Sequence, residues 1–207
     1  MKKPLIILTG PTAVGKTKLS ISLAKTVNGA IISADSMQVY RHMDIGSAKI
    51  RPEEMCGVPH YLIDVLDPSE EFHVVKFVEL AHEAMEKIYA AGQIPIVTGG
   101  TGFYIQALLK EVDFTESHGE LPIRKQLEEK AATEEGAAEL YRELSEVDPA
   151  SAETIHPNNV KRVIRALEYY HETGQKISEH NEEQKQKESP YCSAYFVLND
   201  ERSILYD

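Results

Sequence analysis

The sequence has little of what marks several classes of protein. Only two of its 207 residues are cysteines, Cys56 and Cys192, and they form no C-x-x-C pattern, which argues against a zinc site or a disulfide scaffold. The histidines show no metal-ligand spacing, so we interpret them as structural or surface residues. No segment approaches the roughly 18 to 20 consecutive apolar residues that span a bilayer, and we expect no membrane partner.

Positive charge is also scarce. Lys and Arg number 22 against 33 Asp and Glu, which gives a formal net charge of −11 at pH 7. This balance counts against a protein that coats nucleic acid with its whole surface. A local basic face stays open, because phosphates are contacted by particular Lys and Arg side chains within about a Debye length.

The N-terminal segment lacks the pattern of a cleaved signal peptide. Lys2 and Lys3 make its start basic, but the apolar run from Leu5 to Leu8 is short and continues directly into a glycine-rich loop. Cleavage behind that run would remove the loop, and we therefore expect a cytoplasmic protein.

This loop is the most specific pattern in the chain. It matches G-x-x-x-x-G-K-[ST] between an apolar strand and an amphipathic helix, and it consists of Gly10, Pro11, Thr12, Ala13, Val14, Gly15, Lys16 and Thr17. The glycines allow turns in which successive N–H groups point at an anion, and the helix adds the positive end of its dipole. Lys16 can reach outer phosphates, and the Thr17 hydroxyl can bind an accompanying Mg²⁺. The pattern predicts a phosphate-binding loop without naming the phosphate.

The rest of the first half repeats a strand, a turn and a helix. Apolar runs predict strands at 30–34, 58–65 and 94–98, and periodic patterns predict helices at 18–27, 72–91 and 103–109. Residues 39–55 have the composition of a crossover rich in loops. This order predicts an α/β fold, a P-loop NTPase-like parallel sheet with flanking helices.

The composition changes after Asp113. Residues 115–186 are polar and poor in strands, with helical patterns at 122–132, 134–144 and 159–172. Strand character returns at 193–198, and a helix is predicted from 201 to 206. We therefore expect a core at 1–114, a helical insertion subdomain at 115–190 and a return to the core at 191–207.

Two predicted turns hold further candidate residues. Asp35 follows the strand at 30–34, and ligands gather at the carboxyl ends of strands in open α/β sheets. Its carboxylate can act as a base, as a magnesium ligand or as a helix cap. The run Gly99-Gly100-Thr101-Gly102 can form a second anion cradle at a helix N-terminus, or only a tight turn.

A basic cluster lies in the predicted helix at 159–172. Lys161 and Arg165 share one face with Arg162 beside them, while Val163 and Ile164 face elsewhere. Such a pattern is usually the solvated face of an amphipathic helix. In so acidic a chain the local concentration of positive charge favours a clamp on a phosphate backbone.

In order along the chain, these segments resemble the bacterial tRNA dimethylallyltransferases. The likeness is carried by residues 10–17, 35–40, 44–49, 99–104, 156–159 with Arg162, and 165–168. Members of this family transfer a dimethylallyl group from its diphosphate to N6 of the adenine on the 3′ side of the anticodon. The resemblance implies tRNA and dimethylallyl diphosphate as partners, and a loop that holds a diphosphate leaving group.

The resemblance also implies roles for single residues. Residues 12–17 would bind the diphosphate with Mg²⁺ at Thr17, Asp35 would take the proton of the adenine amine, and Thr101 would lie near the reacting centre. Contacts with tRNA are implied for Asp35, Ser36, Met37, Gln38, Thr101, Arg124, Lys161, Arg162, Val163, Ile164 and Arg165. The target base would leave its stack and enter a channel between core and insertion. We expect a monomer.

The chain departs from this family in its length. Family members continue well beyond the point that corresponds to Asp207, with a basic helix whose arginine helps to hold the diphosphate. The sequence is therefore either C-terminally truncated or that of a protein without part of its tRNA- and phosphate-binding surface, and we expect weak or absent turnover from these 207 residues alone.

A small-molecule kinase of the nucleoside type is the main alternative, because it shares the loop, the sheet and the helical insertion. Against it, no predicted strand ends in an obvious Walker B aspartate, and Asp64 is the nearest substitute. A nucleotide switch is disfavoured, since no guanine-reading N-K-x-D occurs.

Overall fold

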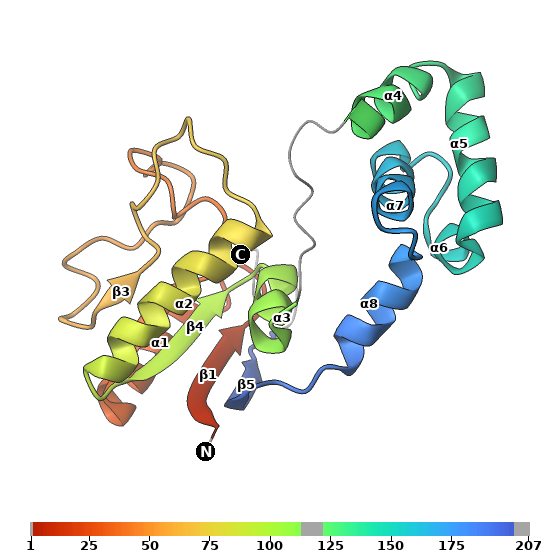
Figure 1. Ribbon diagram of the computed structural model, residues 1–207. Helices are drawn as coiled ribbons and strands as arrows, with labels where there is room; N and C mark the ends of the chain where they lie inside the picture. The colour runs from red at the N-terminus through yellow and green to blue at the C-terminus, as the bar shows by residue number, and fades with distance from the viewer. Residues whose placement is uncertain (1, 113–121, 201–207) are drawn as a thin grey trace. The chain divides into compact units, whose positions relative to one another are not determined.

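The computed structural model describes residues 2–112 and 122–200, which belong to two compact units (Figure 1). Residues 2–112 and 188–200 belong to the first unit, and residues 122–187 belong to the second. The second unit is therefore an insertion in the first. The predicted boundary at 114 and the predicted helix at 201–206 lie outside the described residues.

The first unit is built on a five-stranded sheet in the order β3-β2-β4-β1-β5. Its strands are β1 (Lys3–Thr9), β2 (Gly29–Ser33), β3 (His60–Tyr61), β4 (Ile94–Gly99) and β5 (Tyr191–Val197). All four pairings are parallel, and Ile6 on β1 lies opposite Ile96 on β4 and Ala194 on β5. The predicted parallel sheet and its resumption after the insertion are both confirmed.

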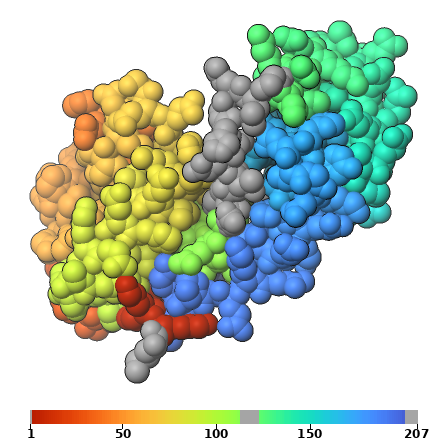
Figure 2. Space-filling view, viewed as in Figure 1, coloured from red at the N-terminus to blue at the C-terminus, as the bar shows by residue number. Residues whose placement is uncertain are grey.

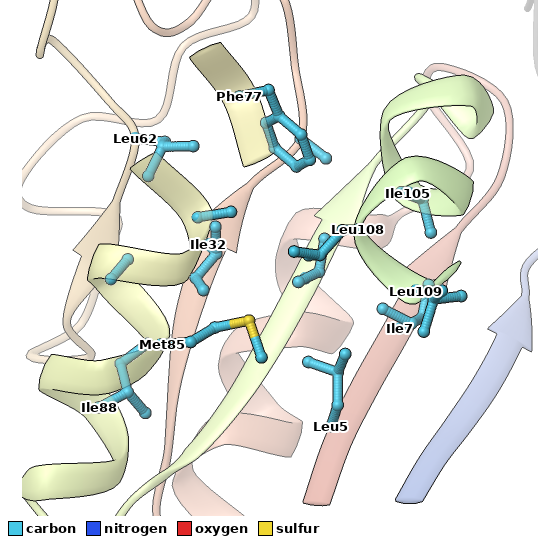
Figure 3. Close-up of a cluster of buried hydrophobic side chains, with 14 of the residues drawn as sticks. Leu5, Ile7, Ile32, Leu62, Phe77, Met85, Ile88, Ile105, Leu108 and Leu109 are labelled. Atoms are coloured by element: carbon cyan, nitrogen blue, oxygen red, sulfur yellow. The ribbon is translucent and has the colours of Figure 1, made fainter. Parts of the chain in front are cut away.

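Helices cover the two faces of this sheet. Helices α2 (Val74–Ala90) and α3 (Gly102–Lys110) pack against Ile7, Ile32 and Val97 on one face (Figure 3), and α1 (Lys16–Val27) packs near Ile31 and Ile96 on the other. Successive strand residues point to opposite faces, so apolar residues at adjacent positions are buried on both sides. The continuous apolar runs of the sequence have this physical origin.

The strand predicted at 58–65 is wrong in its extent. Only His60 and Tyr61 pair with β2, because Leu62 and Asp64 take left-handed backbone conformations with φ of 61° and 54°. Leu62 is nevertheless buried against the core, so its apolar character reflects burial without strand pairing. The loop-rich crossover predicted at 39–55 is confirmed, and it forms part of the surface coloured orange to gold in Figure 2.

The second unit consists of helices over the residues that the structure describes. They are α4 (Pro122–Lys130), α5 (Glu134–Val147), α6 (Pro149–Thr154), α7 (Val160–Thr173) and α8 (Ile177–Gln186). Their shared core includes Leu140, Leu144, Val163 and Leu167. Three of the helices were predicted; α6 was missed because it is short, and α8 because its polar sequence lacks apolar periodicity. Among the described residues no helix is both long and apolar enough to cross a membrane.

One buried carboxylate holds two of these helices. Asp148 is 1% exposed and accepts four hydrogen bonds, from the backbone N–H and hydroxyl groups of Ser151 in α6 and of Ser178 in α8, at 2.6 to 3.1 Å. Burial alone would raise the pKa of Asp148, but these hydrogen bonds outweigh it and lower the pKa below its ordinary value. Asp148 therefore caps both helices in its ionised form.

Replacing this carboxylate should cost stability in a pH-dependent way. Asp148→Asn should destabilise the second unit by about 2 kcal/mol at neutral pH, because an amide cannot accept all four hydrogen bonds. A lowered folded-state pKa gives stability that is present above the unfolded pKa, about 4, and lost as the pH falls through the folded value. The difference between wild type and variant in urea unfolding, followed by helical circular dichroism, should therefore shrink below about pH 4. A difference independent of pH would contradict this account.

The ends of β1 and β5 meet at a glycine. The Leu198 N–H donates to the Thr9 carbonyl at 2.7 Å, and a Cβ on Gly10 would lie 2.4 Å from the Leu198 carbonyl oxygen. Gly10 also has a φ of 152°, which side chains rarely allow. Gly15 has a positive φ as well, but a Cβ there would meet nothing within 4 Å.

These two glycines offer a matched comparison. Gly15→Ala should cost about 1 kcal/mol from backbone strain alone. Gly10→Ala should cost at least about 1 kcal/mol more, since strain and a backbone clash add. Urea midpoints of the two variants measure the difference, and equal midpoints would show that β5 moves aside freely.

Candidate functional site

The glycine-rich loop joins β1 to α1 and leaves the start of that helix without a side-chain cap. Gly15 occupies the N-cap position with a φ of 87°, and no side chain bonds to the first N–H groups. Ala13 is also left-handed, with a φ of 69°. The loop therefore offers backbone N–H groups and the positive end of the helix dipole to an anion.

Lys16 bends back over this loop. Its ammonium donates to the carbonyl oxygens of Gly10 at 2.9 Å and Pro11 at 2.6 Å. Burial lowers the pKa of Lys16, and the charge of Asp35 partly opposes that shift. Lys16 thus lies at the centre of the loop, near a carboxylate from the next strand.

Asp35 lies just beyond β2 in a tight turn. Its Oδ1 accepts hydrogen bonds from the N–H groups of Met37 at 2.8 Å and Gln38 at 3.3 Å. Both bonds engage the same oxygen, which fixes the carboxylate relative to the backbone. Neither of these hydrogen bonds involves Oδ2, so this oxygen is left for a ligand.

A close backbone approach brings this turn beside the one that carries Thr101. A Cβ on Gly99 would lie 2.5 Å from the carbonyl oxygen of Ala34, so glycine lets the ends of β2 and β4 meet. Thr101 then forms the N-cap of α3, but its hydroxyl caps no N–H group. The Gly99–Gly102 turn therefore leaves a threonine hydroxyl for another partner.

These segments line one pocket of about 700 Å³ in the first unit. Its lining includes Thr12, Ala13, Gly15, Lys16, Thr17, Lys18, Asp35, Ser36, Met37, Gln38, Gly46, Ser47, Ala48, Gly100 and Thr101. The structure thus brings together the predicted loop, the Asp35–Gln38 turn and Thr101. Of the loop, Gly10, Pro11 and Val14 lie outside this lining.

Residues 46–48 form a wall of this pocket that sequence reasoning did not assign. Gln38 ties the wall to the Asp35 turn, because its Nε2 donates to the carbonyls of Ala48 at 3.2 Å and Ser47 at 3.5 Å. Its Oε1 accepts from the Ser33 hydroxyl at 3.2 Å. No periodic pattern signals such a wall, since it depends on where an irregular crossover folds back.

The donors in the pocket suit a magnesium ion that arrives with a phosphate ligand. Mg²⁺ binds proteins through few oxygen ligands and keeps waters or substrate phosphates for the rest. Thr17 and Asp35 provide such oxygens in the lining. Within the described ranges no three His, Cys, Asp or Glu side chains gather into a metal cluster.

The basic helix of the second unit is α7, and it divides its predicted residues between core and solvent. Lys161 and Arg162 are exposed and Arg165 is partly exposed. Val163 and Ile164 are 1% and 6% exposed in the core of the unit, so their side chains are unavailable for surface contacts. Within this predicted contact segment, only the basic side chains are accessible at the surface of the second unit.

Arg165 and Arg124 share a carboxylate. Glu168 has a side chain that is 2% exposed, and its Oε2 lies 3.2 Å from Arg165 Nη1 and 3.6 Å from Arg124 Nη1. Arg124 Nε also donates to Glu128 at 3.1 Å. Glu168 thus fixes the two arginines beside each other, and its i,i+3 spacing from Arg165 was the signal that sequence reasoning left unused.

Comparisons with known proteins show which proteins this chain resembles. The chain is 65% identical to a tRNA dimethylallyltransferase of Lachnoclostridium phytofermentans, over 99% of this chain and 65% of that protein. It is 49% identical to the enzyme of the same name from Bacillus mycoides, over 100% of this chain and 64% of that protein. The chain therefore spans slightly less than two thirds of these relatives.

Solved structures give the same result. A eukaryotic dimethylallyltransferase acting on tRNA superposes with a TM-score of 0.82 at 39% identity, over 95% of this chain and 48% of that one. The tRNA isopentenylpyrophosphate transferase of Bacillus halodurans superposes with a TM-score of 0.65 at 45% identity, over 100% of this chain and 63% of that one. The family model described as IPP transferase matches residues 38–207. Since that match covers most of the sequence, the chain belongs to the IPP transferase family.

Proposed function

We propose that this chain is the core of an enzyme that transfers a dimethylallyl group from dimethylallyl diphosphate to N6 of the adenine on the 3′ side of a tRNA anticodon. The observation that carries the proposal is the single pocket in which an anion-binding loop, a fixed carboxylate and a free threonine hydroxyl converge. Its membership of the IPP transferase family supports the same reaction. The cytoplasmic location and the monomeric state of the enzyme remain predictions.

The loop would hold the leaving group. Backbone N–H groups at the start of α1 and the Lys16 ammonium would stabilise the charge that develops on the diphosphate as the allylic carbon–oxygen bond breaks. Thr17 and the diphosphate would hold Mg²⁺, which supplies further stabilisation of negative charge when it is bound. No phosphoryl group moves in this reaction.

Asp35 would act on the acceptor. As the new carbon–nitrogen bond forms, the adenine amine becomes positively charged and loses a proton, which the Asp35 carboxylate would accept. Its Oδ1 is engaged by Met37 and Gln38, so Oδ2 is the oxygen left for the amine. The uncapped Thr101 hydroxyl would hydrogen-bond near the reacting centre.

A nucleoside-type kinase is the less well supported function for the same phosphate-binding loop. Its best substitute for a Walker B aspartate, Asp64, binds the Lys49 ammonium at 2.6 Å and lies outside the pocket lining. The relatives are named as transferases acting on tRNA. ATP consumption that depends on a nucleoside would nevertheless favour the kinase function over the transferase function.

Removing the base tests the reaction. Asp35→Asn should lower the transfer rate by roughly 10²- to 10⁴-fold, because a positioned general base supplies about that factor. The rate is measured by mass analysis of tRNA digests after single-turnover incubation with dimethylallyl diphosphate. Both the chain alone and a chimera continued with the last third of the Lachnoclostridium relative are assayed, with the chain alone expected to be weak or inactive.

Asp67→Asn serves as the matched control, since Asp67 lies in the turn before α2 and outside the pocket. It should leave transfer unchanged. Full transfer by the Asp35→Asn chimera would remove Asp35 from the role of base, and no transfer by the unmodified chimera would overturn the proposed reaction.

The arginine pair of the second unit should contribute to tRNA affinity. Arg165→Gln should weaken binding and lower the slope of log K against log salt by about 0.7 to 0.9, the value for one phosphate contact. Lys185→Gln on α8, an exposed lysine paired with Glu182, is the control for lost charge in the same unit. A slope equal in both variants would count against Arg165 as a contact.

A further inference from the structure

Lys49 is a buried cation that the proposed reaction does not use. Its side chain is 5% exposed, and its ammonium donates to the Tyr40 carbonyl at 2.7 Å, to Asp44 Oδ1 at 2.7 Å and to Asp64 Oδ1 at 2.6 Å. A lysine ammonium has three N–H donors. All three therefore have a partner within the first unit.

The three partners come from three separate segments of irregular backbone. Tyr40 ends the turn that begins at Asp35, Asp44 begins the segment that includes the pocket wall, and Asp64 follows β3 with a φ of 54°. The Asp64 N–H also donates to the Gln38 carbonyl at 3.1 Å. The turn and the Asp64 segment are also joined by an isolated parallel bridge between Tyr40 and Leu66, so the ammonium's own contribution is to attach the Asp44 segment to both.

Two hydrogen bonds of Gln38, at 3.2 and 3.3 Å, connect this crosslink to the reacting side of the pocket. The wall ends next to Lys49 at Ala48, whose carbonyl accepts from the Gln38 side chain. The Gln38 N–H in turn donates to Asp35 Oδ1. Ala48 is left-handed with a φ of 47°, which is unfavourable for a residue with a Cβ, so contacts must hold this end of the wall, whereas Gly46 adopts its φ of 78° without strain.

We propose that Lys49 is a positioning residue that fixes the 46–48 wall and, through Gln38, the orientation of the Asp35 carboxylate. It acts on the acceptor side of the pocket and not on the phosphate-binding loop, since none of its bonds reaches residues 10–17. The effect on Asp35 rests on the proposed function; the ordering of the wall does not.

A methionine at position 49 isolates this role. It has similar length and suits a buried site, but it donates no hydrogen bond. The two carboxylates that lose their partner are 68% and 50% exposed, so Lys49→Met strands no buried charge. The variant should therefore fold, and Asp64→Asn, which keeps an acceptor for the ammonium, should show the same effects more weakly.

Hydrogen exchange tests the crosslink without reference to the reaction. In Lys49→Met, the hydrogen-bonded amides of Met37, Gln38, Tyr40 and Arg41 should exchange at least about tenfold faster, while those of α2 should not change. The dissociation constant of inorganic diphosphate with Mg²⁺ should stay within about twofold of the wild-type value, because the loop keeps its own contacts. Lys76→Met on α2, which removes an exposed lysine paired with Glu79, should change neither quantity.

Transfer to tRNA gives the third readout, in the chimera described above. Lys49→Met should lower the single-turnover rate roughly 10- to 100-fold at saturating donor, as expected for a misplaced catalytic group. Unchanged exchange at Met37, Gln38, Tyr40 and Arg41 would overturn the positioning role, and so would equal losses of exchange protection in α2 and of diphosphate affinity, which would indicate general destabilisation. If the unmodified chimera transfers nothing, the proposed function fails while the exchange result still decides the role of Lys49.

Discussion

The parallel hydrogen bonding of β1 between β4 and β5 is the constraint on which the first unit depends. It sets the carboxyl ends of neighbouring strands at one edge, so that the glycine loop after β1 and the turns after β2 and β4 line a common pocket. Close backbone contacts at Gly10 and Gly99 complete this edge. Because β1, β2 and β4 are packed on both faces, the positions of these turns follow from packing that lies well below the pocket.

Charged groups act differently in the two units. In the first, carboxylates and ammonium groups hold irregular backbone, as Lys49 does with Asp44 and Asp64. In the second, Asp148 is the N-cap of α6 and also accepts hydrogen bonds from the start of α8, and Glu168 aligns two arginines on different helices. An acidic chain can thus present ordered positive charge, since its own carboxylates determine where the few basic side chains point.

The regular part of this architecture could be predicted from sequence because burial and periodicity act locally. The loop at 10–17, Asp35 and Thr101 follow strands whose apolar runs are plain, and the structure brings them together. The extent of β3 could not be predicted, since Leu62 is apolar for packing and left-handed in backbone. Lys49 and the 46–48 wall were not predicted because their partners are set by tertiary folding, as is the contact of Glu168 with Arg124. The roles of the tRNA-contact residues remain predictions.

The two hydrogen bonds of Lys16 to backbone carbonyls affect which ligands can bind at the loop. The ammonium donates to the carbonyls of Gly10 and Pro11, so a ligand that bonds to it competes with acceptors at 2.9 and 2.6 Å. Neutral groups compete poorly for a cation held in this way, whereas charge-assisted bonds to a polyanion are stronger than those to carbonyls. The position of Lys16 therefore favours a highly charged anion at this loop over a neutral molecule.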